Sequence, residues 1–148
     1  MGVLSRIVKQ SDSDINQLIV PPEHARVLYY VSHVGVVTSA LAYSRGHIWL
    51  ATIVGTCVGT SLSYWNRPTY GMRRNIDIAA VQLSLWSHTY NAHSSQYVLA
   101  YYTIISLGIA AFFASWNTMQ QNKLWHSILL HAVVHISAHL SCLCVYYG

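Results

Sequence analysis

The sequence predicts an all-α membrane protein: a polytopic helical bundle of about five transmembrane spans joined by short loops, forming a single membrane domain. Only 8% of the 148 residues are charged and 53% are hydrophobic, whereas soluble domains average about 25% charged residues. The few charges are also segregated, since no Asp, Glu, Lys or Arg falls between Asp77 and Lys123. A helix crosses the hydrocarbon with about 20 mostly apolar residues and satisfies all its own backbone polar groups.

The first part of the chain predicts a tail and two spans. Residues 1–24 form a short cytoplasmic tail without a cleavable signal peptide, because charged residues interrupt its apolar runs. Pro22 suits the first turn of the helix that follows, and Glu23 is favourable near the positive end of that helix. The first span covers about 25–43, residues 44–46 make a turn, and the second span covers about 47–65.

The second part of the chain predicts three more spans. The third covers about 75–91, with Asn75 as a helix cap, and it is the most polar of the five. The fourth covers about 96–116. A polar loop at 117–123 separates it from the fifth span, at about 124–147.

The distribution of Lys and Arg predicts the orientation. Seven of the eight lie on one predicted side and only Arg45 lies on the other, so the N-terminus is expected in the cytoplasm and the C-terminus on the opposite side. The seven are Arg6, Lys9, Arg26, Arg67, Arg73, Arg74 and Lys123. Because they are explained by membrane topology, and no basic helix with interleaved aromatic residues is present, no nucleic-acid partner is predicted.

Small residues at intervals of four predict close helix packing. The second span contains Gly55, Gly59 and Ser63, and the first contains Gly35 and Ser39 at the same spacing. Such faces let helix backbones approach closely in lipid. The Gly55/Gly59/Ser63 face is therefore predicted to contact another helix, a protein partner or a second copy of the chain, with the lipid bilayer as the surrounding partner.

One face of the third span is polar. Asp77, Ser84, His88 and Asn91 are spaced so that they share a helix face, which must point to the bundle interior, a subunit or water. Asp77 has two interpretations: a functional carboxylate, or a structural one that complements the helix dipole and pairs with Arg73 or Arg74.

The fifth span carries three histidines on consecutive turns. His131, His135 and His139 are each four residues apart, a spacing that lets neighbouring pairs bind a metal ion. One helix rarely completes such a site, so a further ligand is expected from His88 or His33. The alternative is that these histidines form hydrogen bonds between helices.

A sparse pattern across three spans resembles the CREST superfamily, which includes alkaline ceramidases, adiponectin-receptor-like and Per1-like proteins. Ser61 precedes position 65 by four residues, Asp77 follows twelve residues later, and His131–His135 or His135–His139 lies in the last span. The resemblance implies a zinc-dependent lipid amide hydrolase in which three histidines bind the metal while Asp and Ser position water. This chain departs from the pattern at Trp65, where a metal-binding histidine is expected, and by having about two spans fewer than the usual seven.

These observations leave several functions open. The favoured one is a small integral membrane protein that serves as a structural or assembly subunit of a membrane complex, without catalysis. The first alternative is a metal-dependent lipid hydrolase with Asp77 and Ser61 as catalytic residues and zinc bound by His131, His135, His139 and His88. Less favoured are a bis-histidine haem protein, with His33–His88 or His88–His135 as axial ligands, and a proton pathway.

Overall fold

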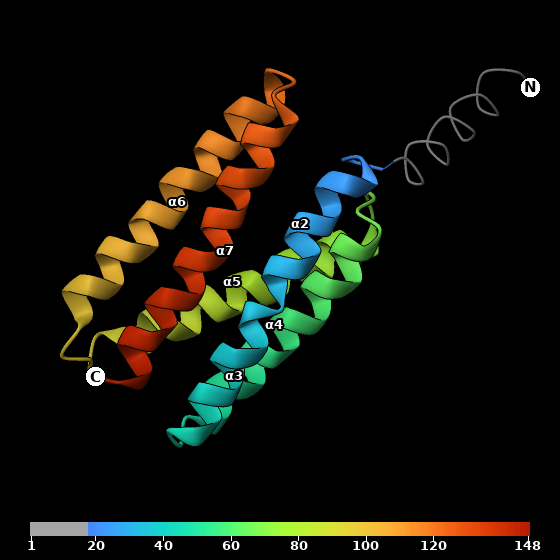
Figure 1. The fold of residues 1–148 in the computed structure, drawn as a ribbon. Helices are drawn as coiled ribbons and strands as arrows, with labels where there is room; N and C mark the ends of the chain where they lie inside the picture. The colour runs from blue at the N-terminus through green and yellow to red at the C-terminus, as the bar shows by residue number, and fades with distance from the viewer. Residues whose placement is uncertain (1–17) are drawn as a thin grey trace, which may run out of the picture.

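The protein is a bundle of helices in a computed structural model, which describes residues 18–148 (Figure 1). The part of the predicted tail before residue 18 lies outside these described residues. Apart from a single β-bridge between Leu18 and Thr69, the elements in the described chain are helical, and the predicted all-α class is confirmed. The helices are α2 (Pro22–Ser32), α3 (Val34–Ser44), α4 (Ile48–Asn66), α5 (Met72–Ala92), α6 (Val98–Gln120) and α7 (Leu124–Tyr146).

Four of these segments are long and apolar enough to cross a membrane. They are α2 with α3, which together span Pro22–Ser44, and then α4, α6 and α7. Helix α5 has 21 residues and is therefore about 32 Å long, but it does not belong to this apolar set. By length and hydropathy the described chain therefore has four candidate spans where the sequence predicts about five, because the polar face of α5, visible in the third predicted span, lowers its hydropathy.

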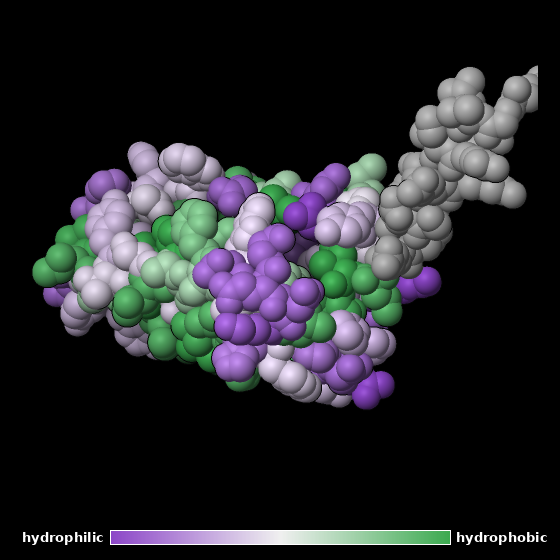
Figure 2. Space-filling model, turned by 90° about the horizontal axis from the view of Figure 1, so that it is seen from above, coloured by the Kyte–Doolittle hydropathy of each residue, from purple (hydrophilic) through white to green (hydrophobic). Residues whose placement is uncertain are grey.

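The segment of α2 and α3 runs down, α4 and α6 run up and α7 runs down, whereas α5 crosses obliquely from the end of α4 to the start of α6, so that loops far apart in sequence lie towards the same end (Figure 1). The start of α2, the 67–71 loop and the 121–123 loop lie at one end, where the described cations other than Arg45 belong. The 45–47 loop, the 93–97 loop and the end of α7 lie at the other. Seen from the first end, hydrophilic residues gather near the middle and hydrophobic residues lie to either side (Figure 2).

Helix α5 begins earlier than the sequence predicts. Gly71 precedes it with φ of 126°, a left-handed backbone conformation that favours glycine, and the helix starts at Met72. The Asn75 amide already donates to the Gly71 carbonyl at 3.2 Å. The prediction that Asn75 caps this helix is therefore wrong, and Asp77 lies in the second turn, too far along for a strong interaction with the helix dipole.

Small residues bring α3 close to α4 and α7. A Cβ added at Gly35 would lie 2.8 Å from His139 Cε1, and one added at Gly55 would lie 3.4 Å from Ser39 Oγ. Ser39 also donates across the interface to the Ala51 carbonyl at 2.8 Å. Gly55 therefore contributes to helix packing within this chain, whereas an added Cβ at Gly59 would meet nothing within 4 Å.

The apolar core is divided into two clusters. One includes Leu28, Trp65 and Ile128, and the other includes Leu50, Tyr101 and Val145. Buried polar side chains lie along the same helices, and among them are Thr38, Ser61, Asp77, His88, Ser137 and Ser141. In lipid, such groups must find partners within the bundle, and the candidate site lies among them.

Candidate functional site

A buried hydrogen-bonded group joins α4 to α5. Ser61 Oγ donates to Asp77 Oδ1 at 2.6 Å, and Thr60 Oγ1 donates to the same oxygen at 3.1 Å. Asp77 is 8% exposed and Ser61 is 3% exposed. The short distance is typical of a hydroxyl bonded to a carboxylate. Two residues that the sequence selects as catalytic, sixteen positions apart, are therefore in direct contact.

The structural interpretation of Asp77 needs a correction. Asp77 forms no ion pair with Arg73 or Arg74, because within residues 18–148 the only close contact between an acidic and a basic side chain joins Glu23 to His24. The guanidinium of Arg74 instead lies over the Tyr70 ring, 5.5 Å from its centroid. The carboxylate of Asp77 is held by hydroxyl groups of the neighbouring helix, as expected for a polar group that ties two helices together in lipid.

Trp65 and the first two histidines of α7 form an aromatic contact between helices. The Trp65 ring lies 5.4 Å from the His131 ring, and the His131 ring lies 5.5 Å from that of His135 (centroid distances). Phe112 of α6 packs on the other side of His131 at 6.2 Å. Trp65 is one helical turn beyond Ser61, so the positions of the CREST-like pattern lie within neighbouring turns of α4, α5 and α7.

His139 and His88 lie in different surroundings. His139 packs against Gly35 at the crossing of α3 with α7. His88 is 2% exposed, and both of its ring nitrogens have partners: Nδ1 is 2.8 Å from the Ser84 carbonyl and Nε2 is 2.8 Å from the Tyr146 hydroxyl. Because a carbonyl only accepts, Nδ1 carries the hydrogen and Nε2 accepts from Tyr146. The lone pair that a metal would need is thus engaged.

The structure does not support the predicted zinc site. Within the described part of the chain, no three His, Cys, Asp or Glu side chains come close enough to hold a metal ion. His131 and His135 are neighbours, but His88 and His139 have other contacts, and Trp65 offers only an N–H donor where the CREST-like pattern needs a ligand. The residues therefore do not fit a zinc ion as arranged.

The predicted haem pairs are not supported either. His33 is exposed and its Nδ1 lies 3.0 Å from the Tyr29 carbonyl. His88, which both pairs require, is bonded to Tyr146. An axial ligand must offer a free ring nitrogen to the iron, and both ring nitrogens of His88 are engaged.

Two contributors were not predicted from the sequence. Tyr146 completes the hydrogen bonding of His88 from 58 positions away, and Thr60 adds a second donor to Asp77. Thr60 could have been found from its place beside Ser61, on a helix predicted to pack closely. Tyr146 gives no such signal, because 11 tyrosines occur in the chain and several lie near predicted span ends.

The hydrogen bond between His88 and Tyr146 gives a measurable prediction. We expect His88→Phe and Tyr146→Phe each to destabilise the protein, and their double mutant to show a coupling free energy of about 1 kcal/mol, because each variant removes the same bond in a lipid-surrounded bundle. Unfolding in mixed micelles followed by circular dichroism measures it. Additive effects of the two substitutions would contradict the bond.

The fold and site together define a small α-helical integral membrane protein, with four helices able to span the bilayer. The chain matches no family model, no curated protein and no solved structure. Its function is therefore argued from the arrangement of its own residues.

Proposed function

We propose that this protein is a structural or assembly subunit of a membrane complex, and that its buried polar residues hold its helices together. The contact of Ser61 and Thr60 with Asp77 carries the proposal. It shows that the carboxylate predicted to be catalytic is hydrogen-bonded to the neighbouring helix, where it can hold α4 and α5 together. The other polar positions support it in the same way. His88 bonds to Tyr146 across helices, and Trp65 packs on His131.

The shortness of the loops also supports a role within the membrane. The connections between the long helices cover only 45–47, 67–71, 93–97 and 121–123. Such loops offer little surface for a soluble substrate, whereas many large apolar side chains point outward along the helices, including Trp86, Leu99 and Phe113. These side chains suit contact with lipid or with the helices of a partner.

We place the end that carries Arg67, Arg73, Arg74 and Lys123 in the cytoplasm, following the positive-inside rule. The C-terminus then lies on the opposite side. A cysteine introduced at the 121–123 loop should react with a membrane-impermeant maleimide only after the membrane is opened. Labelling in intact cells would show that the orientation is the opposite one.

We also propose that the arrangement derives from a CREST-like framework whose metal site has been lost. The contact between Ser61 and Asp77, and the packing of residue 65 on His131, favour this relationship. The competing function is a metal-dependent lipid hydrolase, and metal content separates the two. We expect far less than one zinc per chain in the purified protein by elemental analysis. About one zinc per chain, lost in His131→Ala, would overturn the structural proposal and favour hydrolysis.

Trp65→His tests the proposed derivation directly. An imidazole at position 65 faces His131, which itself neighbours His135, so the substitution supplies a third nitrogen ligand. We expect zinc content to rise towards one per chain after purification with added zinc. Trp65→Phe is the matched control and should remain without zinc. Equal zinc content in the two variants would argue against the CREST-like framework.

A further inference from the structure

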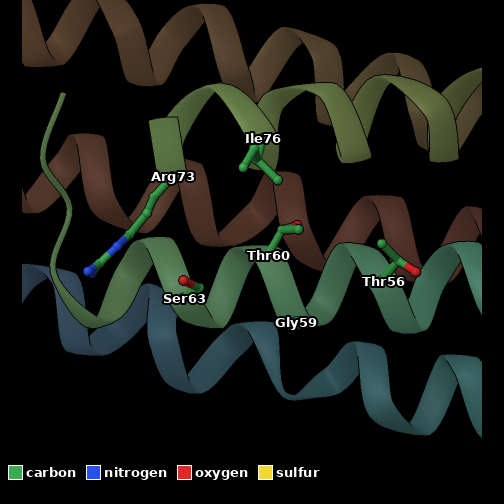
Figure 3. A pocket seen from close by; sticks show the side chains of 6 residues that line it. All are labelled: Thr56, Gly59, Thr60, Ser63, Arg73 and Ile76. Atoms are coloured by element: carbon green, nitrogen blue, oxygen red, sulfur yellow. The ribbon is translucent and has the colours of Figure 1, made fainter. Parts of the chain in front are cut away.

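A groove runs along the outer side of the contact between α4 and α5, near the arginine-rich end. Its volume is about 310 Å³. Arg73 stands at its end beside Ser63, and Ile76 forms part of its wall (Figure 3). The remaining lining residues are Thr56, Gly59 and Thr60 of α4.

The walls of this groove suit a hydrocarbon chain. Thr56 donates to the Thr52 carbonyl, and the single hydrogen of the Thr60 hydroxyl is shared between the Cys57 carbonyl and Asp77, so neither hydroxyl needs a polar partner in the groove. Gly59 leaves open space, since an added Cβ would meet no atom within 4 Å. From Ser63 to Thr56 the groove extends about 10 Å along α4, which takes it from the loop level towards the depth of the hydrocarbon.

Within residues 18–148, no acid pairs with the positive charge at the end of the groove. Arg73 is exposed and forms no ion pair with any acid of residues 18–148, while the neighbouring Arg74 is placed over Tyr70. Asp77 is turned towards Ser61 and Thr60, inside the helix contact. A guanidinium favours a phosphate, to which it donates paired hydrogen bonds.

These observations point to an anionic phospholipid as the occupant. We propose that its phosphate binds Arg73 and that one acyl chain lies in the groove over Gly59. A second copy of this chain fits less well, because a two-fold symmetric contact on this face would bring two Arg73 side chains to the same level with no acid between them. This inference goes beyond the proposed structural role and does not depend on it.

Native mass spectrometry of the purified full-length protein tests the proposal. The protein is mixed in mild detergent with equal amounts of phosphatidylglycerol and phosphatidylcholine of identical acyl chains. We expect the wild type to retain phosphatidylglycerol preferentially. Arg73→Gln should reduce that preference about fivefold, the change that corresponds to the loss of one cation near an anionic headgroup. Arg67→Gln removes the same charge at the same end of the bundle, outside the groove, and should leave the preference unchanged.

Gly59→Leu tests the part of the proposal that concerns the acyl chain. Because the position opens into the groove, the leucine should fill the groove without disturbing the bundle, and retention of phosphatidylglycerol should fall. The melting temperature confirms that the variant is folded. Equal retention of the two lipids by the wild type, an equal loss in Arg67→Gln, or a folded Gly59→Leu that keeps its lipid would each overturn the proposal. Conversion of a dimer to a monomer by Gly59→Leu, without change in bound lipid, would assign the groove to a second copy instead.

Discussion

Gly35→Val is expected to lower the free energy of unfolding by about 1–3 kcal/mol, the usual cost of overfilling a packed interior. Gly35 lies where α3 crosses both α4 and α7, and a Cβ there would contact the side chains of Val58 and His139. Its approach to His139 Cε1 would be 2.8 Å, closer than non-bonded carbon atoms tolerate. Unfolding in mixed micelles, followed by circular dichroism, measures the change.

Gly59→Val is the matched control. It makes the same chemical change in a helix of the same bundle, but at a position where an added Cβ meets nothing within 4 Å. We expect little change or a small gain in stability, since glycine costs up to about 1 kcal/mol in a helix interior. Similar destabilisation by both substitutions would show that α3 does not cross α4 and α7 at Gly35 as described.

Asp77→Ala is expected to destabilise the protein by about 2 kcal/mol, because the buried Ser61 hydroxyl loses its acceptor, whereas Thr60 keeps the Cys57 carbonyl. Asp77→Asn keeps an oxygen at the same place and should recover most of this loss. The same unfolding measurement applies. Asp77→Ala combined with Ser61→Ala should cost less than the sum of the two single substitutions, since they remove one shared bond.

The behaviour of Asp77→Ala also separates the two interpretations of this carboxylate. A stability loss that is rescued by Asp77→Asn agrees with a helix-to-helix tie. A variant with unchanged stability would contradict that structural role and would favour a catalytic role for Asp77.

The fold could be predicted from the sequence because lipid restricts the choices so strongly. Apolar stretches of the right length must be helices, and the polar residues between them must be loops. The turn at 44–46 and the close packing of Gly35, Ser39 and Gly55 followed from residue type alone, and Gly46 does adopt a left-handed φ of 84°. The start of α5 was missed because Gly71, four residues before the helix was expected, already provides the conformation that lets it begin.

The candidate site was only partly predictable. Helix periodicity places His131, His135 and His139 on one side of α7, but it does not say what faces each of them. In the structure, His131 packs on the indole ring of Trp65, His139 packs against Gly35, and His88 forms a hydrogen bond with a tyrosine 58 positions later. Whether three histidines bind a metal depends on the rotation and spacing of several helices. The spacing of residues along one helix does not predict these.

The central position of helix α7 in the bundle affects how the protein assembles in the membrane. It packs against α6 on one side and against α2 and α3 on another, and it supplies Ile128 and Ala132 to one core cluster and Val145 and Tyr146 to the other. Yet it follows all of these helices in the chain. The faces of the earlier helices that contact α7 therefore stay turned to lipid until α7 is inserted, and its insertion completes both clusters. A chain stopped before residue 124 should keep the contacts of α2, α3 and α5 with α4 but lack both completed clusters, and it should be a target for membrane proteases.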